Sequence, residues 1–340
     1  MKATMSIVIF SAITILISTA GCELPDDTGM QILMIADGDF DDNSFNENCR
    51  EGLDRAVDDL GVTAEYAVVD NMTALDSALD GFVDGGHDII IANGFLFAEG
   101  IADAAGRHPD QKFALVDYAY ETIPPNINCV VFASDEAAFP LGYLAAAWSV
   151  LQGPDNASTA YVGGMDIPPV RQWTEAFCNG ADYYNSRHNA SVTCGGAFAD
   201  DFYDEQGGKA LAESLIAGGA DVILGCGGQA GNGALLQAQE MGKWGIGVDK
   251  DMYELLPEIG ESLLSSGIKR FDNGVYSVVE SVVAGTFDGG GVYQGNLSNG
   301  GITLAPYHAF EDRIPQETQS EIDTIIQSIK DGTVETGWEE

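Results

Sequence analysis

Closely spaced carboxylates near the start of the sequence are the first candidates for chemistry. Asp37, Asp39 and Asp41 stand at alternate positions, as in the opening of a calcium loop that supplies oxygen ligands. Asp42 stands where such a loop needs glycine, and Asn48 stands where it needs a bidentate glutamate. We therefore expect no metal site, and a loop that is solvated or contacts a ligand is the preferred interpretation. A calcium-dependent nucleoside hydrolase built on this loop is an alternative.

A glycine-rich turn offers a second kind of chemistry. Residues 225–230 follow the pattern G-x-G-x-x-A, and Asp249 lies about 20 residues further on, as in dinucleotide-binding turns. Such turns recur in α/β folds and can present backbone N–H groups to any polar ligand. The sequence contains no Walker, G-x-S-x-G or H-E-x-x-H motif, and its four histidines stand far apart. We expect a protein that is not an enzyme, with no catalytic residue and no cofactor.

The elements that must position these residues alternate between two patterns. Short apolar runs alternate with segments of helical spacing, which predicts βαβ units, parallel sheets and the α/β class. The elements are too many for one ordinary doubly wound sheet, so two Rossmann-like lobes are expected. The expected strands are 31–36, 64–69, 88–92, 112–117, 129–132, 159–162, 221–224 and 244–248. The expected helices are 48–60, 74–85, 98–108, 137–150, 171–185, 206–217 and 233–241.

Polar residues follow several of the expected strands. Parallel sheets bind ligands outside the carboxyl ends of their strands, and a cleft between two domains is a preferred site for a small molecule. The polar residues at these strand ends are therefore expected to face a shared cleft.

The N-terminal sequence is typical of an export signal. Residues 1–21 hold one charge, Lys2, followed by an apolar run and small residues, as in a secretory signal peptide. The sequence Thr19-Ala-Gly-Cys22 resembles the lipobox of bacterial and archaeal lipoproteins, which implies lipidation of Cys22. Conventional cleavage of the signal is the alternative. Residues 22–29 are then the lipidated cysteine and a polar tether, and we expect an extracytoplasmic, membrane-anchored protein at the cell surface or in the periplasm.

The remaining cysteines leave the disulfide pattern open. In an oxidising compartment Cys178 could bridge to Cys194, and Cys49 could bridge to Cys129. All of them could equally be small buried hydrophobic residues, and Cys226 at a strand end fits that interpretation best.

The chain is strongly acidic. Its 340 residues include 53 Asp and Glu against 14 Lys and Arg, for a formal net charge of -39, while 45% are hydrophobic. This balance predicts a well-cored protein that does not bind nucleic acid and that disfavours anionic ligands. We interpret the excess of carboxylates as an adaptation to a salty medium, where repulsion between like charges is screened.

Several strand-end segments together resemble one family, the basic membrane protein (Bmp) lipoproteins, which include the purine nucleoside receptor A type. The pieces occur in family order over roughly residues 31–310. They are Asp42-Asn-Ser-Phe-Asn46, Gly94-Phe95, Phe139-Pro-Leu-Gly-Tyr-Leu-Ala-Ala146, Val162-Gly-Gly-Met-Asp-Ile-Pro168, Phe202-Tyr-Asp204, Gly228-Gln-Ala-Gly-Asn-Gly233, Ile246-Gly-Val-Asp249 and Ser265-Ser-Gly-Ile-Lys269.

The resemblance implies a type I periplasmic-binding-protein fold whose chain crosses the hinge three times. It places lobe 1 at residues 30–133 plus 261–288 and lobe 2 at 134–260 plus 289–330, with 331–340 as a tail. The implied role is the substrate-binding lipoprotein of an ABC importer, which captures a nucleoside, a purine in the first instance, as the lobes close. The implied partners are a neutral small molecule, a membrane permease and the lipid anchor, with the protein a monomer.

The resemblance also implies a set of ligand contacts. Phe45 and Phe202 would stack on the two faces of a planar base. Asp249 and Lys269 would hold the ribose hydroxyls, although Asp249 could instead cap the helix that begins near Met252. The other expected contacts are Asp42 or Asn43 at the base edge, with Asp37, Asn46, Gly94, Asp117 and Gly228 around them; Trp173 could be a pocket wall or lobe packing.

One departure from the family pattern keeps an alternative open. The family often has Asp-x-Asp-Gln where this chain has Asp249-Lys-Asp-Met252, so a contact from the glutamine is missing. A receptor or sensor of the same fold for another small ligand, such as a riboflavin-like ring or a sugar, is therefore the main alternative to a nucleoside importer.

Overall fold

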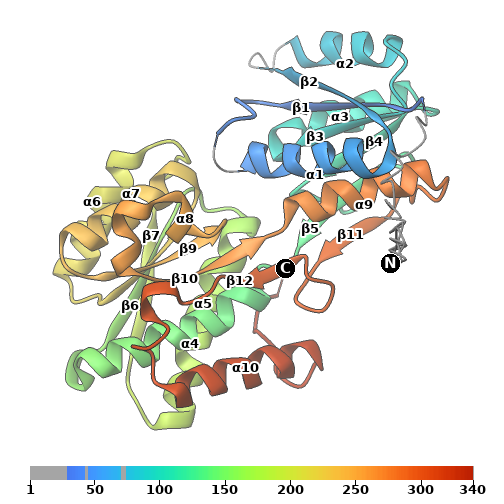
Figure 1. The fold of residues 1–340 in the computed structure, drawn as a ribbon. Helices are drawn as coiled ribbons and strands as arrows, with labels where there is room; N and C mark the ends of the chain where they lie inside the picture. Colours follow the sequence, from blue (N-terminus) through green and yellow to red (C-terminus); the bar gives the residue numbers. More distant parts are fainter. Residues whose placement is uncertain (1–28, 43–44, 70–73, 340) are drawn as a thin grey trace, which may run out of the picture.

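The computed structural model describes residues 29–42, 45–69 and 74–339, and within them the chain folds into two α/β lobes (Figure 1). The expected signal peptide, Cys22 and Asn43 lie outside the described residues.

The first lobe is built on a parallel sheet of six strands in the order β11-β5-β4-β3-β1-β2. Alternate strand residues face two separate cores: Ile32 and Met34 pack beneath α1 and α9, while Leu33 and Ile35 pack beneath α2 and α3. The strands are β1 (Gln31–Ala36), β2 (Thr63–Val68), β3 (Ile89–Asn93), β4 (Lys112–Val116), β5 (Ile127–Phe132) and β11 (Val292–Gly295). The helices are α1 (Phe45–Leu60), α2 (Leu75–Asp84), α3 (Ala98–Arg107) and α9 (Phe271–Val283).

The second lobe repeats this plan. Its six strands follow the order β12-β10-β9-β8-β6-β7, in which only β12 runs antiparallel to its neighbour. The strands are β6 (Ser158–Gly163), β7 (Thr193–Phe198), β8 (Val222–Cys226), β9 (Trp244–Asp249), β10 (Leu263–Lys269) and β12 (Ile302–Leu304). The helices are α4 (Asp135–Gln152), α5 (Pro168–His188), α6 (Glu205–Ala217), α7 (Gly228–Glu240), α8 (Met252–Leu255) and α10 (Gln316–Lys330), of which α10 packs on α4.

The chain passes between the sheets at positions that correct the expected lobe boundaries. Residues 261–288 were expected in lobe 1, but β10 pairs with β9 in the second sheet, so the chain crosses only after Lys269, and α9 then packs on α1. Residues 289–330 were expected in lobe 2, but β11 pairs with β5 in the first sheet (Figure 1). The return to lobe 2 therefore follows Gly295. The expected boundaries were wrong because the sequence analysis expected no strand at β10 or at β11, both of which contain a glycine.

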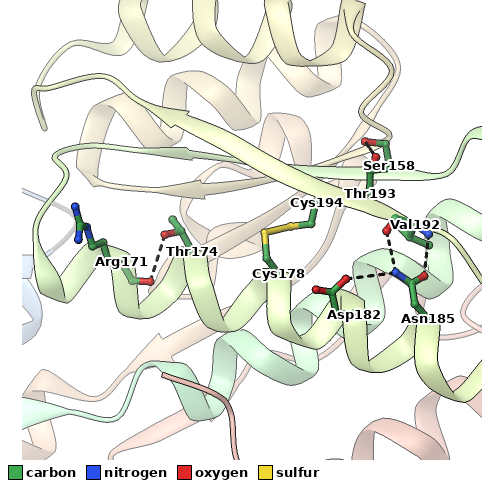
Figure 2. The surroundings of a disulfide bond; sticks show 9 residues. All are labelled: Ser158, Arg171, Thr174, Cys178, Asp182, Asn185, Val192, Thr193 and Cys194. Atoms are coloured by element: carbon green, nitrogen blue, oxygen red, sulfur yellow. Dashed lines mark hydrogen bonds between the residues drawn. A yellow bond between two sulfur atoms is a disulfide. The ribbon is translucent and has the colours of Figure 1, made fainter. Parts of the chain in front are cut away.

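A disulfide joins helix α5 to strand β7 within the second lobe (Figure 2). Cys178 and Cys194 form it, with their Cα atoms 5.4 Å apart. The nearby side chain of Asn185 donates to the Val192 carbonyl at 2.9 Å and accepts from the Val192 N–H at 2.8 Å. These two hydrogen bonds hold the end of α5 to the segment that leads into β7, in addition to the disulfide between the two elements. One of the two candidate bridges is thus present.

The other candidate bridge does not form. Cys49 packs in the core beneath α1 and Cys129 packs in the core on the opposite face of the same sheet, so the sheet separates the two thiols. Cys226 is buried as a free thiol, as the sequence suggested.

Helices α4 and α5 touch backbone to backbone through two glycines. A β-carbon on Gly142 would collide with the carbonyl oxygen of Phe177, and one on Gly180 would collide with that of Phe139. This contact fixes α5, whose first two turns carry Pro169 and Trp173 to the cavity between the lobes.

Gly142→Ala is accordingly expected to destabilise the protein by about 1–3 kcal/mol, because the helices must separate to admit one methyl group. Gly106→Ala is the matched control: this glycine lies in helix α3 with no atom near its missing β-carbon, so alanine should be neutral or stabilise by about 0.5–1 kcal/mol. Urea unfolding measures both variants. Equal free energies of unfolding for the two would contradict the close helix contact.

Candidate functional site

A cavity of about 790 Å³ lies between the two lobes, at the carboxyl ends of both sheets. Its volume is within the range of sites for small organic ligands. The described residues that the sequence nominated all line it: Asp37, Asp42, Phe45, Asn46, Gly94, Asp117, Phe202, Gly228, Asp249 and Lys269. The structure thus brings these residues together, and their contacts with a ligand stay predictions.

Phe45 forms the first-lobe wall, and its position follows from the start of helix α1. The Asp42 carboxylate accepts hydrogen bonds from the backbone N–H groups of Asn46 and Glu47, each at 3.1 Å, and so satisfies donors that the helix leaves unpaired. The Phe45 ring packs edge-to-face on Phe271, with ring centroids 4.8 Å apart. Asp42 therefore helps to hold the helix turn that presents Phe45, in addition to lining the cavity.

Phe202 forms the second-lobe wall, against the glycine-rich turn. Its ring packs where Gly164 would carry a β-carbon, and its carbonyl accepts from the Ala230 N–H at 3.2 Å. Gly227 and Gly228 have φ angles of 140° and 55°, and a β-carbon on Gly227 would strike the backbone of Gly164. Gly228 in turn lies against Phe202, so close packing of the chain explains both glycines.

An ion pair between a buried ammonium and a partly exposed carboxylate joins the two lobes in the lining of the cavity. Lys269, at the end of β10, is 4% exposed and donates to both carboxylate oxygens of Asp117 at 3.0 and 3.1 Å. Burial by itself lowers the pKa of Lys269, but the charges of Asp117 and Asp249 raise it above its ordinary value. The amine therefore stays protonated in the buried site.

Asp249 shares this environment as a second carboxylate. Burial raises its pKa to about 6, Asp117 adds to the rise, and Lys269 opposes it. Asp249 and Asp117 both have positive φ angles, 70° and 60°, which non-glycine residues rarely adopt. Each lies directly at or after the end of a strand, and the strained backbone is of the kind that accumulates at functional sites.

The helix cap considered as the alternative role of Asp249 is formed by Asp251. The Asp251 carboxylate accepts from the N–H of Tyr253 at 3.1 Å and contacts His308 Nε2 at 2.7 Å. This correction has a simple reason: α8 begins at Met252, so only Asp251 has the right position to cap it.

Several cavity residues were not foreseen from the sequence. Phe95 and Leu96 follow Gly94, and Tyr203 follows Phe202, so the family motifs contained a signal for both groups. Trp173 unites both of its expected roles: it lines the cavity, yet it is 2% exposed and packs against Gly267. Asn93 directly follows the expected strand 88–92, so its place at a strand end was a signal for it, but it was not named as a ligand contact.

Two further polar contacts cross the cleft. Lys250, after β9, pairs with Glu47 of α1 at 3.1 Å. The Tyr203 hydroxyl lies 3.5 Å from a carboxylate oxygen of Asp37. The two lobes therefore also meet through these two contacts, and of their side chains Tyr203 and Asp37 line the cavity.

Comparison with known proteins places this geometry in a family. Residues 30–336 match the family model described as Bmp, ABC transporter substrate-binding protein PnrA-like. The chain belongs to the Bmp family. It is 28% identical to basic membrane protein A of Borreliella burgdorferi over 316 residues, which covers 91% of this chain and 86% of the relative. It is 30% identical to an uncharacterized lipoprotein of Pyrococcus furiosus over 268 residues, which covers 77% and 66% of the two chains.

Solved structures confirm the expected fold of this Bmp-family protein. A solute-binding protein of an ABC transporter system from Aeropyrum pernix is similar with a TM-score of 0.80 and 26% identity, covering 90% of this chain and 92% of that one. A periplasmic solute-binding protein from Actinobacillus succinogenes with bound D-allose shares the fold at a TM-score of 0.60 and 12% identity, covering 83% and 99%. The type I periplasmic-binding-protein fold with two parallel-sheet lobes is thus confirmed.

Family membership makes this chain an ABC transporter substrate-binding protein, which implies a small-molecule ligand and a permease partner. The relatives named lipoproteins imply an extracytoplasmic location. None of the helices in residues 29–42, 45–69 and 74–339 has the length and apolar character to cross a membrane.

The raised pKa of Asp249 predicts a pH-dependent effect on stability. The folded protein holds a proton on Asp249 up to about pH 6, whereas the unfolded chain releases it near pH 4, so this residue lowers stability as pH rises from 4 through 6. Asp249→Asn should therefore stabilise the protein by about 1–2 kcal/mol at pH 7.5 and by much less at pH 4.5. Chemical denaturation at both pH values measures the difference.

The exposed Asp323 of helix α10 provides the control, because Asp323→Asn should change stability little at either pH. A gain for Asp249→Asn that is the same at pH 4.5 and 7.5 would contradict the burial of its charge.

Proposed function

We propose that this Bmp-family protein captures a purine nucleoside between its lobes for an ABC importer. The observation that carries the proposal is the pair of phenylalanines, Phe45 from lobe 1 and Phe202 from lobe 2, that line one cavity together with the Lys269, Asp117 and Asp249 cluster. Aromatic walls suit the flat faces of a base. Carboxylates and an ammonium suit vicinal ribose hydroxyls, which both donate and accept.

The charge of the cavity supports a neutral ligand. Lys269 is the only basic side chain among the described residues that line it, and Asp117 already occupies this ammonium. Several carboxylates line the same space. A phosphate group would meet repulsion without an arginine to bind it, so a nucleoside is favoured over a nucleotide.

Capture of the ligand follows because the ligand contacts more side chains in the closed form than in the open form. A ligand that touches Phe45 alone gains part of its binding energy on one lobe, and it gains the rest when Phe202 closes over it. The closed form is favoured by that difference in affinity, and the permease reads this form. In this proposal the mature protein is a monomer anchored through lipid on Cys22, and it catalyses no reaction.

Calorimetric titration tests the proposed ligand class with guanosine, inosine, adenosine, riboflavin and a panel of sugars. We expect a purine nucleoside to bind, and Phe45→Ala or Phe202→Ala to weaken that binding about 10- to 100-fold through lost stacking. Phe82→Ala, in a half-buried position on helix α2 away from the cavity, should leave affinity unchanged.

Binding of riboflavin or a sugar in place of every nucleoside would support the alternative receptor of the same fold. Nucleoside binding that survives both cavity substitutions would refute the assignment of Phe45 and Phe202.

A further inference from the structure

Asn93 has an unusual environment at the floor of the cavity. It ends strand β3, lines the cavity, and its side chain is 1% exposed. Its Nδ2 donates to Asn46 Oδ1 at 3.3 Å. Its Oδ1 is buried and accepts no hydrogen bond from any described residue. Asn93 therefore carries a buried acceptor without a partner beside the space that a ligand would fill.

An unpaired buried acceptor is costly. A buried group without a hydrogen bond loses its bonds to water and gains none in return, and nearly all buried polar groups in folded proteins are paired. A hydrophobic residue at the end of β3 would avoid this cost, as Ile89, Ile90 and Ile91 do earlier in the strand. The position of the amide at the cavity wall suggests that its missing partner is a ligand.

The neighbouring strand ends show what kind of group that partner offers. In the sheet order β4-β3-β1, Asn93 lies between Asp117, after β4, and Asp37, after β1. Both neighbours carry carboxylates, which accept hydrogen bonds when ionised. Three neighbouring strand ends of the first lobe thus carry hydrogen-bond acceptors, namely Asp117, Asn93 and Asp37. Together they suit a ligand edge that presents N–H or O–H groups.

We propose that Asn93 is a specificity-determining residue whose Oδ1 accepts a hydrogen bond from an N–H or O–H group of the ligand. The inference rests on the proposed nucleoside function and sharpens it. A site built around a buried polar group rejects an analogue that lacks the complementary group more strongly than an apolar pocket would. The preferred nucleoside therefore carries a donor at this point of the cavity.

The test compares Asn93→Leu with wild type by calorimetric titration. The probes are guanosine, purine riboside, whose base has no N–H donor, and the 2′-, 3′- and 5′-deoxy forms of guanosine. Asn93→Leu should weaken guanosine binding about 10- to 100-fold. One analogue, the one that lacks the matched donor, should bind the two proteins with nearly equal affinity.

Two outcomes would overturn the assignment. One is an unchanged affinity of Asn93→Leu for guanosine. The other is an equal loss for every compound, because a general distortion of the cavity does not distinguish donors.

Asn128 provides the matched control. Its Oδ1 is also buried without a partner among the described residues, and its Nδ2 donates to the Asp288 carbonyl at 3.0 Å, but it lies on β5 outside the cavity lining. Asn128→Leu should leave all affinities as they are in wild type. Weaker guanosine binding by this variant would show that loss of any buried amide in this sheet has the same effect, and would count against a special role of Asn93.

Melting of the ligand-free protein separates this inference from the proposed function. If the wild-type protein binds no nucleoside, the proposed function is refuted. The melting temperature of the double variant Asn46→Leu/Asn93→Leu then shows whether the hydrogen bond between Asn93 and Asn46 is needed for the fold. Apolar replacement of both partners is nearly neutral when a hydrogen bond is not needed for stability. A melting temperature at or above that of wild type supports a pair retained for a ligand, and a fall of about 5 °C or more would assign the pair to the fold and overturn the inference.

Discussion

The contact between Lys269 and Asp117 is the interaction on which the site depends. A buried ammonium needs nearby carboxylates to stay charged, and this one draws its partner from the other lobe. The pair brings the end of β10 to the end of β4, and this places Asp249, the next strand end in the second sheet, beside the same charge. Two positive φ angles, at Asp117 and Asp249, are maintained there by the surrounding sheets. The polar half of the cavity is therefore defined by one cation that serves two carboxylates.

The aromatic half depends on close backbone packing instead. Phe202 is placed by glycines of two neighbouring turns that approach too closely for any side chain, and Phe45 by a helix whose first N–H groups bind Asp42. The same principle recurs further from the cavity, where Gly142 and Gly180 bring α4 and α5 into backbone contact. Three segments shared with the Bmp family serve mainly to allow close packing of the backbone in this structure. They lie around residues 139–146, 162–168 and 228–233. They shape a cavity whose ligand is then selected by a few polar side chains.

The sequence predicted those strands and helices whose residues follow a local apolar pattern. Strand β1 was predicted at its observed bounds because residues 32–36 form a continuous apolar run after Gln31, and the alternation of elements correctly indicated two parallel sheets. Strand β7 escaped prediction because its sequence, TCGGAF, contains two glycines, and β10 because LLSSGIK mixes polar and apolar residues; the wrong lobe boundary followed from that omission. Family resemblance nominated residues that line the cavity, but it could not indicate which carboxylate pairs with Lys269. The unpaired oxygen of Asn93 depends on burial and on a neighbour 47 positions away, so no local pattern encodes it.

In the proposed mechanism the cavity between the lobes takes up the ligand, and both lobes close on it. The net charge of -39 lies mostly outside this site and fits a charged, hydrated surface, while within the site a single lysine balances the carboxylates nearest to it. Small-angle X-ray scattering of the protein with and without a saturating purine nucleoside tests the claim most directly. We expect a smaller radius of gyration with the nucleoside, and a scattering profile that fits the two-lobed structure with the Lys269–Asp117 contact formed. A nucleoside that binds stoichiometrically and leaves the scattering profile unchanged would contradict it.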